Sequence, residues 1–475
     1  MCAGSRTRDS PPVPFHPLVE EWDAGLTAGD PLGFPGYAAR LADLDGESVR
    51  TGCTEHYAFV ESRFDVHGGT IGAAAGEKVV RAYDRAVDRR LPMVVFTRTG
   101  GARVQEGMVA LAQLGRTSAA AQRHSAGGLL SLGVYGSPTT GGVFVSYASL
   151  VDLRAAHPTA TIGFAGPRVA EEALGTSLPA GSHSAQSLYD IGLLDELVQP
   201  GEEAAWVEVA LGLREQGLPT RPLPAVDDPG VDGAWGEVLR ARAVGRPTGI
   251  DRAARLCSSW LELNSGDRTV RAGLGVVAGR RCVVVATDRY HADGRPTPEG
   301  YRLAQRAFAF AGRVGLPVVT LVDTPGADPS PEAELNGIGL EIARTFAAMA
   351  ACPTPIVSVC VGEGGSGGAL ALSCGDRLLI SEHAVFSVIG PEGAAAILER
   401  DAAKAPEVAE RLKLTARDLK ELGIVDDVIG DGQDALDAAV AAALDTAVVG
   451  DRERRFAAAT DRWLHVTPPI RRSPA

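Results

Sequence analysis

The chain has 475 residues, of which 45% are hydrophobic and 22% are charged, and at about 150 residues per domain this length predicts two or three globular domains. The formal net charge of −13 argues against a nucleic-acid-binding protein, because such proteins need a basic surface. Charges interrupt every apolar stretch before the roughly 18 residues that span a bilayer, and the first residues lack the apolar core of a signal peptide, so we expect a cytoplasmic protein with no membrane partner.

The first half of the sequence alternates between helical and buried-strand patterns. Residues 76–90 carry apolar side chains at helical spacing, and the apolar run 93–96 is typical of a strand that is covered on both faces. A glycine turn, Thr99-Gly-Gly-Ala-Arg, follows this run. After a second apolar run at 129–135 the chain reaches another glycine cluster, Thr139-Thr-Gly-Gly-Val.

The same order returns about 225 residues later. The second series consists of a helical pattern at 304–314, an apolar run at 318–322, the turn Asp323-Thr-Pro-Gly-Ala, an apolar run at 355–361 and the cluster Gly364-Gly-Ser-Gly-Gly. Such agreement in unchanged order indicates a duplicated domain. We predict an α/β domain with a parallel sheet at residues 1–217, a Pro- and Asp-rich linker at 218–249 and a second such domain at 250–475.

The glycine clusters are the candidate sites of chemistry. Glycine after a strand leaves backbone N–H groups free and lets a ligand approach without a Cβ in the way. In the first half, Gly100-Gly101-Ala102 can converge with Gly141-Gly142. In the second half, Pro325-Gly326-Ala327 can converge with the cluster that begins at Gly364. Each pair of turns would form an oxyanion hole, in which backbone donors stabilise a developing negative charge.

Side-chain catalysts are less well supported by the sequence. The serine in Gly364-Gly-Ser-Gly-Gly lacks the surroundings of a hydrolase nucleophile. His67 and His124 are more typical of structural histidines, and Glu106 and Glu363 are more typical of residues that orient loops than of an acid or base. The seven cysteines form no CxxC pair, so we expect no metal site.

The motifs carry a resemblance to a known family. From about residue 55 to 200 the chain resembles the β subunit of bacterial acetyl-CoA carboxylase carboxyltransferase, through Gly68-Gly-Thr-Ile-Gly, Gly76-Glu-Lys, Gly100-Gly-Ala-Arg-Val-Gln-Glu-Gly, Pro138-Thr-Thr-Gly-Gly-Val and Ile162-Gly-Phe-Ala-Gly-Pro-Arg-Val. From about 250 to 430 it is similar to the α subunit, through Pro298-Glu-Gly-Tyr-Arg, Asp323-Thr-Pro-Gly-Ala, Gly362-Glu-Gly-Gly-Ser-Gly-Gly-Ala-Leu-Ala and Pro391-Glu-Gly. The resemblance implies a fused β–α acyl-CoA carboxyltransferase with two tandem crotonase-like domains.

The resemblance also implies a mechanism. Carboxybiotin would release CO₂ in the site, and the biotin nitrogen would then take the α-proton of an acyl-CoA, so no protein base is required. The residues expected to hold the thioester enolate oxygen are Gly100, Gly101 and Gly142, and those expected to polarise the biotin ureido oxygen are Gly364 and Gly365. The expected substrate contacts beside them are Ala102, Arg103, Gly141, Gly326, Gly367 and Gly368. For Arg103, a CoA phosphate and a structural ion pair remain open.

The resemblance further implies partners. The sequence has no Met-Lys-Met biotin attachment site and no biotin carboxylase, so we expect a separate biotin carboxyl carrier protein and a separate biotin carboxylase. In fused relatives the site lies between the first domain of one chain and the second domain of another, which implies a homodimer or a higher even oligomer. Cys2 and Cys53 are the only cysteines before residue 257, so we expect no four-cysteine zinc ribbon of the kind that the bacterial β subunit carries.

Three other functions remain open. The same chemistry run in reverse would make the chain part of a biotin-dependent malonate or methylmalonyl-CoA decarboxylase. A degenerate carboxyltransferase would serve only assembly. A biotin-free hydratase or hydrolase would need a side-chain base, for which Glu106 is the one weak candidate. The sequence does not select the acyl group, since one methylene changes selectivity by only about 1–3 kcal/mol.

Overall fold

The computed structural model describes residues 14–44 and 46–464, so Cys2 lies outside the described residues. The chain forms two compact units. The first is built mainly from residues up to Gln216, joined by Ser259–Gly266 and Arg313–Gly315, and the second from the remaining residues.

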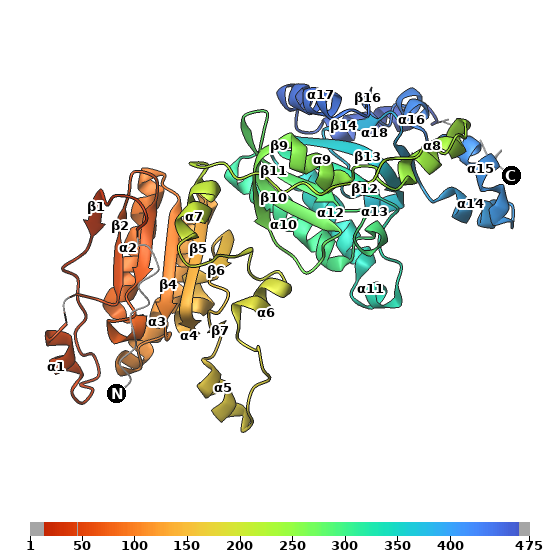
Figure 1. The fold of residues 1–475 in the computed structure, drawn as a ribbon. Helices are drawn as coiled ribbons and strands as arrows, with labels where there is room; N and C mark the ends of the chain where they lie inside the picture. Colours follow the sequence, from red (N-terminus) through yellow and green to blue (C-terminus); the bar gives the residue numbers. More distant parts are fainter. Residues whose placement is uncertain (1–13, 45, 465–475) are drawn as a thin grey trace, which may run out of the picture. The chain divides into compact units, whose positions relative to one another are not determined.

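The first unit is built on a sheet with the strand order β1-β2-β3-β4-β5-β6-β8, in which β7 pairs with β5 (Figure 1). Its strands are β1 (Glu20–Trp22), β2 (Val49–Cys53), β3 (Ala58–Ser62), β4 (Met93–Thr99), β5 (Ser131–Thr140), β6 (Leu153–Ala156), β7 (Ile162–Gly163) and β8 (Glu196–Leu197). The pairs β1–β2 and β2–β3 are antiparallel, and from β3 onward the pairs are parallel. The carboxyl ends of β4 and β5 therefore meet at one edge of the sheet.

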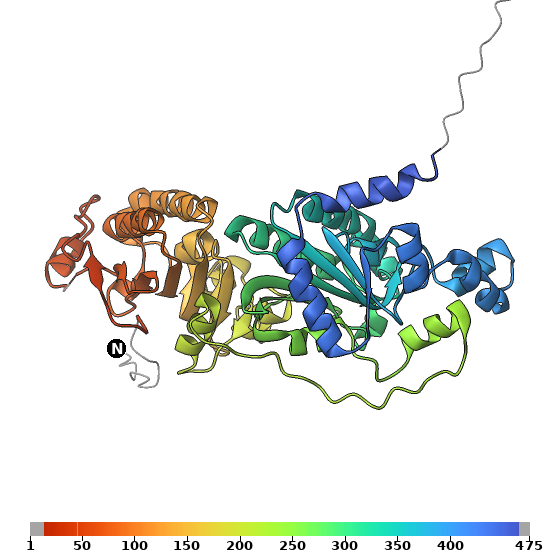
Figure 2. The same ribbon diagram turned by 90° about the horizontal axis from the view of Figure 1, so that it is seen from above.

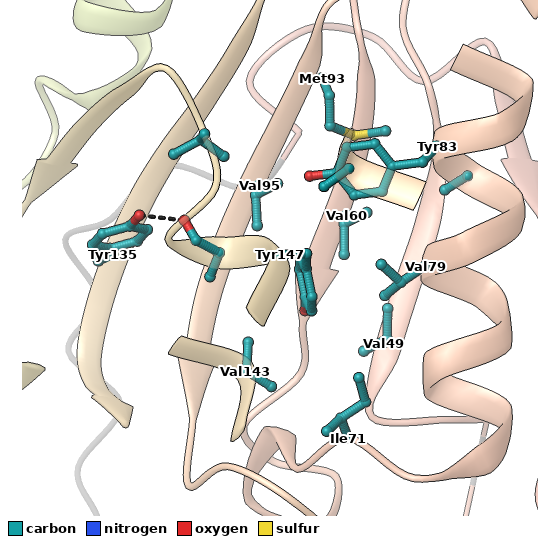
Figure 3. Packing of buried hydrophobic residues seen from close by; sticks show 14 of the residues in the cluster. Val49, Val60, Ile71, Val79, Tyr83, Met93, Val95, Tyr135, Val143 and Tyr147 are labelled. Atoms are coloured by element: carbon teal, nitrogen blue, oxygen red, sulfur yellow. Dashed lines mark hydrogen bonds between the residues drawn. The ribbon is translucent and has the colours of Figure 1, made fainter. Parts of the chain in front are cut away.

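Helices cover this sheet and form the core with it. The helices of this unit are α1 (Tyr37–Ala42), η1 (His67–Gly69), α2 (Ala73–Arg89), η2 (Val104–Glu106), α3 (Gly107–Ala126), α4 (Gly141–Val143), η3 (Phe144–Ala148), α5 (Pro167–Leu174), α6 (Ala185–Asp190) and α7 (Glu203–Leu211), of which α5 has no buried residue. Val79 and Tyr83, one turn apart on α2, pack against Val60 and Val95 of the strands, with Tyr147 beside them (Figure 3). The predicted helix at 76–90 and the predicted strand at 93–96 are confirmed as α2 and β4.

The second unit repeats this topology. Its sheet contains the order β16-β14-β13-β12-β11-β10, with β15 beside β13, so the pair β12–β13 corresponds to β4–β5. Its strands are β10 (Val270–Val277), β11 (Arg280–Thr287), β12 (Val318–Thr324), β13 (Ile356–Gly365), β14 (Arg377–Ser381), β15 (Val385–Ser387) and β16 (Asp427–Ile429), whereas most of β9 (Cys257–Leu263) falls within the residues assigned to the first unit. Thr99 pairs with Thr139 in the first sheet, and Thr324 pairs with Gly364 in the second. The duplication predicted from the sequence is thus confirmed down to the register of the two central strands.

Helices lie on both faces of the second sheet (Figures 1 and 2). The helices of this unit are α8 (Gly233–Arg242), α9 (Gly249–Leu256), η4 (Ala292–Gly294), α10 (Pro298–Val314), α11 (Pro331–Leu335), α12 (Ile338–Ala351), α13 (Ser366–Leu370), α14 (Pro391–Leu398), η5 (Ala402–Lys404), α15 (Ala405–Leu412), α16 (Ala416–Leu422), α17 (Gln433–Thr446) and α18 (Asp451–Asp461).

The segment predicted as a linker is extended in one part and helical in another. Residues 215–232 form neither helix nor strand, whereas residues 233–242 form α8. The buried side of α8 presents Ala234, Val238 and Ala241 to Val385 and Leu414, among other apolar residues of the second unit. The end of the predicted linker is therefore a packed part of the second unit.

Candidate active site

The first glycine site lies where β4 and β5 end. β4 leads into Gly100-Gly101-Ala102, and β5 leads into α4, which begins at Gly141. Gly101 has a φ of +105°, and a Cβ on it would lie 2.9 Å from the amide nitrogen of Gly142. Only glycine fits here without strain, and this allows the two turns to touch.

Most amides of these two turns are already bonded within the protein. Gly100 N–H donates to the Gly68 carbonyl at 3.0 Å, and Gly141 N–H donates to the Phe164 carbonyl at 3.0 Å. Gly101 N–H donates to Thr99 Oγ1 at 3.0 Å. The prediction that Gly100 and Gly101 donate to a substrate oxygen therefore does not fit the hydrogen bonds of this loop.

The amides that remain are those of Ala102 and Gly142. Ala102 pairs with Ile71 in an isolated parallel β-bridge. The hydrogen bonds of this bridge are made by the Gly101 C=O and the Arg103 N–H, so the Ala102 N–H points away from Ile71. Gly142 is the second residue of α4, where an amide has no intrahelical acceptor. Neither amide donates to another loop or turn in the part of the chain that the structure describes. A Cβ on Gly142 would lie 3.2 Å from Ala102 N, so the two amides are neighbours.

Arg103, which follows this pair, is held in the interior. Its guanidinium bonds to Glu47 and, at 3.0 Å, to Glu106 Oε1, and it donates to Tyr37 Oη at 3.2 Å. The Arg103 side chain is fully buried, and both carboxylates are almost fully buried. The structural ion pair is therefore the role that its contacts support, and the expected contact with a CoA phosphate would require this network to break.

The other acid–base candidates near the first site serve the fold. Glu106 accepts hydrogen bonds from Tyr37 Oη and from Ala73 N, both at 2.6 Å, in addition to Arg103. His124 Nε2 contacts the Leu91 carbonyl at 3.0 Å, at the opposite end of β4 from the glycines. His67 is half-buried, and burial and the charge of Arg103 lower its pKa.

We expect the network around Arg103 to make stability depend on pH. Although burial opposes ionisation of Glu47, hydrogen bonds from Arg103 and Ser48 keep its pKa below the ordinary 4.5. A carboxylate with a lowered folded-state pKa stabilises the fold above its unfolded pKa, and this contribution is lost as the pH falls through the folded pKa. Urea unfolding midpoints of the wild type should therefore fall steeply below about pH 4.5.

The matched variant for this prediction is Glu47→Gln. It should be less stable than the wild type at pH 7, because Arg103 loses a charged partner, and it should lose less stability on acidification. Equal pH slopes for the two proteins would show that Glu47 does not contribute to the acid transition.

The second glycine site has the same construction. Gly326 has a φ of +128°, and its N–H donates to Thr324 Oγ1 at 3.1 Å, as Gly101 does to Thr99. β13 ends at Gly365, and Ser366, with a φ of +57°, begins α13 in the place that Gly141 takes in α4.

By position in the repeat the corresponding amides are those of Ala327 and Gly367, the second residue of α13. Here a Cβ on Gly367 would meet nothing within 4 Å, and it is a Cβ on Gly368 that would lie 2.6 Å from Ala327 N. Within the described ranges neither the Ala327 nor the Gly367 N–H donates to a loop, turn or cap. Gly364 and Gly365 allow close packing where β13 ends, because a Cβ would lie 2.3 Å from the Phe386 ring at the first and 2.0 Å from the Pro325 carbonyl at the second.

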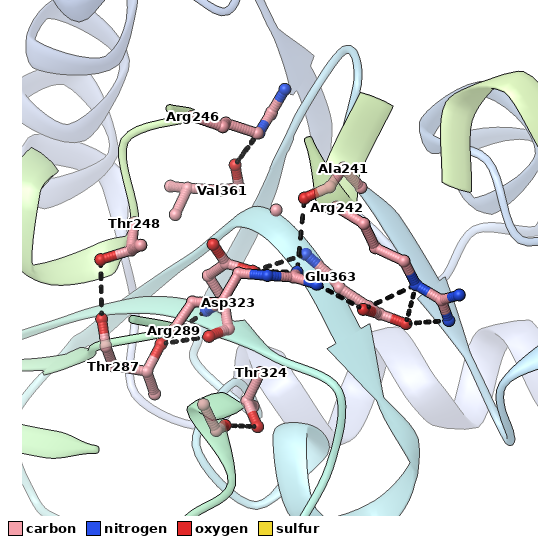
Figure 4. A network of polar contacts seen from close by, with 12 residues as sticks. Ala241, Arg242, Arg246, Thr248, Thr287, Arg289, Asp323, Thr324, Val361 and Glu363 are labelled. Carbon is pink, nitrogen blue, oxygen red and sulfur yellow. Dashed lines mark hydrogen bonds and ion pairs between the residues drawn. The ribbon is translucent and has the colours of Figure 1, made fainter. Parts of the chain in front are cut away.

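Behind the second site lies a network of charges that the sequence did not reveal (Figure 4). Asp323 and Glu363, which immediately precede the two glycine turns, are held by Arg289 and Arg242. Glu363, for which the sequence favours a role in orienting loops over that of an acid or base, is therefore fully engaged in ion pairs. An aspartate as the last residue before a strand-exit Thr-Pro-Gly was the one available signal for this network.

Neither a metal site nor a membrane span is found in the described part of the chain. Among residues 14–44 and 46–464, no three His, Cys, Asp or Glu side chains are placed to hold a metal ion together. In the same ranges no helix combines the length and the apolar character that crossing a membrane requires.

Two family models match the chain and define its class. The model described as a carboxyl transferase domain matches residues 49–187. The model described as acetyl co-enzyme A carboxylase carboxyltransferase-like matches residues 233–453. Each range contains one glycine site, and together they identify the protein as a carboxyltransferase, and hence as an enzyme.

Curated relatives identify the family. The chain is 40% identical over 446 residues to the acetyl-coenzyme A carboxylase carboxyl transferase subunits beta/alpha of Saccharopolyspora erythraea, a match that covers 86% of this chain and 78% of the relative. It is 36% identical over 423 residues to a probable biotin-dependent acyl-coenzyme A carboxylase beta3 subunit of Mycobacterium bovis, with 86% and 84% covered. The chain belongs to the acyl-CoA carboxylase carboxyltransferase family, as its motifs predicted.

A solved structure supports the fold. Transcarboxylase 12S, described as a hexamer with hydrolysed methylmalonyl-coenzyme A bound, matches 90% of this chain and 84% of its own, with a TM-score of 0.69 and 22% identity. At this identity the likeness concerns the fold alone. Together with the family models it confirms the tandem crotonase-like fold.

Proposed function

We propose that this chain is a cytoplasmic carboxyltransferase that moves the carboxyl group from carboxybiotin, held on a separate carrier protein, to the α-carbon of an acyl-CoA. The observation that carries this proposal is the pair of free amides in each unit, Ala102 with Gly142 and Ala327 with Gly367. Two backbone donors suit an oxygen that gains negative charge during a reaction. The relatives named for acetyl-CoA make acetyl-CoA the first candidate substrate.

The first pair would bind the thioester oxygen of the acyl-CoA. As the α-proton leaves, negative charge develops on this oxygen, and the Ala102 and Gly142 amides would stabilise the enolate without any rearrangement. Loss of one such donor typically lowers a rate by about 10²–10³-fold. Glu106 and Arg103 would act from behind, because their contacts fix the loop that carries Ala102.

The second pair fits the ureido oxygen of biotin, an uncharged carbonyl oxygen that two amides can polarise. Bound carboxybiotin would supply CO₂ and then a nitrogen base for the α-proton of the acyl-CoA. This division of labour agrees with the acid–base groups described above, since Glu106 and Glu363 are both held in ion pairs with arginine. The Ala327 and Gly367 amides would favour release of CO₂ by drawing electrons toward the ureido oxygen.

Exposed apolar side chains beside both sites support a dimeric enzyme. Val104, Met108 and Phe164 near the first site are 72–77% exposed, and Val388 and Ile397 of the second unit are 74% and 70% exposed. Large exposed apolar groups of this kind are typical of interaction surfaces. We propose that the first site of one copy faces the second site of another. Sedimentation equilibrium should then give a dimer or a higher even oligomer. A monomer would contradict this arrangement.

The function is tested by carboxyl transfer in the reverse direction, from malonyl-CoA to biotin. Purified protein is mixed with malonyl-CoA and either free biotin or a biotinylated carrier, and release of acetyl-CoA is followed. We expect release that depends on biotin. Methylmalonyl-CoA and longer analogues, tested in the same assay, would rank the acyl groups.

Two outcomes would contradict the proposal. A folded oligomer that transfers nothing with any of these thioesters would indicate an assembly subunit. Turnover that is independent of biotin and lost on replacing Glu106 by Gln would indicate a biotin-free hydratase or hydrolase.

Coupling to a biotin carboxylase and ATP separates an acyl-CoA carboxylase from a decarboxylase that runs the same step in reverse.

A further inference from the structure

The two strand ends that carry the second amide pair are tied together by one buried carboxylate. Asp323 at the end of β12 accepts a hydrogen bond from the backbone N–H of Glu363 near the end of β13, with 2.9 Å between Oδ1 and N. Asp323 is 1% exposed. Ala327 lies four residues after Asp323, and Gly367 lies four residues after Glu363. The hydrogen bond between Asp323 and Glu363 therefore sets the spacing of the two loops.

Two arginines hold these carboxylates in place (Figure 4). Arg289 reaches Asp323 Oδ1 at 3.3 Å and Glu363 Oε2 at 3.4 Å. Arg242 makes the shorter contacts, with Nε at 3.0 Å from both oxygens of Glu363 and Nη2 at 2.6 Å from Oε1. Its Nη1 reaches Glu392 at 2.6 Å. Burial raises the pKa of Asp323, and the charge of Arg289 opposes this rise, so the ionised form of Asp323 depends on the cations around it.

Arg242 comes from the last turn of α8, the helix within the segment predicted as a linker. Its Nη1 contact joins α14, which carries Glu392, to the strand end at Glu363. Removal of Arg242 would leave Glu363 with only the longer contact to Arg289 and would leave Glu392 without its ion pair. The linker helix thus contributes the strongest contact at the rear of the second site.

The first unit shows that the fold itself does not require this network. At the positions about 225 residues earlier stand Arg98 and Pro138. Proline has no amide to donate, and Arg98 instead donates from Nε to the Ser137 carbonyl at 2.7 Å. The carboxylate tie and its arginines therefore belong to the second site specifically.

We infer that Arg242 is a positioning residue for the second amide pair, acting through Glu363 and Asp323 to fix the separation of the Ala327 and Gly367 donors. This inference rests on the proposed function for its kinetic consequence and on the contacts above for its structural one. By this inference, α8 in the segment predicted as a linker helps to position the donors of the second site and does not only connect the two units.

The test compares Arg242→Ala with Arg240→Ala. Arg240 lies on the same helix and pairs with Glu237 and Asp228, so the control removes an equal charge and similar ion pairs. In the malonyl-CoA assay, Arg242→Ala should lower kcat by about 10²-fold, the order expected for a misplaced donor, with little change in KM for malonyl-CoA. Added guanidinium should restore part of this activity, and Arg242→Lys should restore less than full activity, because lysine cannot bind both carboxylates in a planar fork.

Amide hydrogen exchange provides a readout that does not need activity. Arg242→Ala should speed exchange in the peptide that contains residues 364–368, and Arg240→Ala should not. If the wild type transfers no carboxyl group but this exchange difference is found, the proposed function fails and the positioning role stands. If both variants match in exchange and in kcat, or if guanidinium restores nothing to a folded Arg242→Ala protein, the positioning role is wrong.

Discussion

Gly101→Ala and Gly365→Ala should each lower biotin-dependent carboxyl transfer by about 10²–10³-fold, the effect of losing one oxyanion donor. Neither change removes a free amide. In the first, the new Cβ would lie 2.9 Å from Gly142 N, and in the second, 2.0 Å from the Pro325 carbonyl. Each added methyl group must push one loop away from its neighbour, so the two donors no longer reach the same oxygen.

The matched controls are Gly115→Ala and Gly339→Ala. Gly115 lies in α3 and Gly339 in α12, and a Cβ on either would meet nothing within 4 Å. Both controls should keep wild-type kcat, and alanine should slightly stabilise the helices. Full activity in the two test variants, measured as kcat on folded protein, would show that the glycine loops do not carry the reaction.

Arg103→Met should destabilise the first unit by about 3–5 kcal/mol, the usual effect of removing one partner from a buried ion pair. The substitution leaves the buried Glu47 and Glu106 carboxylates without the cation that they share. Urea unfolding at pH 7, followed by a probe in the first unit, measures the effect. The comparison is Arg123→Ala, which breaks a surface ion pair with Asp84 and should change stability by at most about 1 kcal/mol.

A triple variant separates lost charge balance from lost packing. Adding Glu47→Gln and Glu106→Gln to Arg103→Met removes the stranded charges and should recover part of the stability. A single variant as stable as Arg123→Ala would mean that the buried network contributes nothing net to the fold.

The fold could be predicted from the sequence because the duplication repeats both the apolar runs and the glycines that follow them. The donors could not be predicted, because their identity depends on which amides already form hydrogen bonds within the protein. The Gly101 N–H donates to Thr99 Oγ1 and the Gly100 N–H donates to the Gly68 carbonyl, so neither is available to a substrate. Only the three-dimensional structure reveals such local hydrogen bonds. The sequence therefore predicts Ala102 and Gly367 as substrate contacts, whereas we propose them as donors.

The distant partners of the charged supports could not be predicted, for a different reason. Arg103 meets Glu47 across 56 residues, and Arg242 meets Glu363 across 121 residues. No local pattern relates residues so far apart in the chain. The same long reach explains why α8 was placed in a linker, since its sequence between Gly233 and Arg242 becomes structural only through partners in β13, α14 and α15.

Using main-chain amides as the proposed donors changes how such an enzyme can diversify. A backbone N–H is present whatever side chain its residue carries, so mutation can remodel the pocket walls without deleting the groups that stabilise charge. Variation is limited instead where space is absent, as at Gly101 and Gly365, or where a distant ion pair holds a loop. New acyl specificities can therefore arise by exchange of wall residues while the chemistry is inherited unchanged, and a conventional alanine scan of the pocket would leave its most important atoms in place.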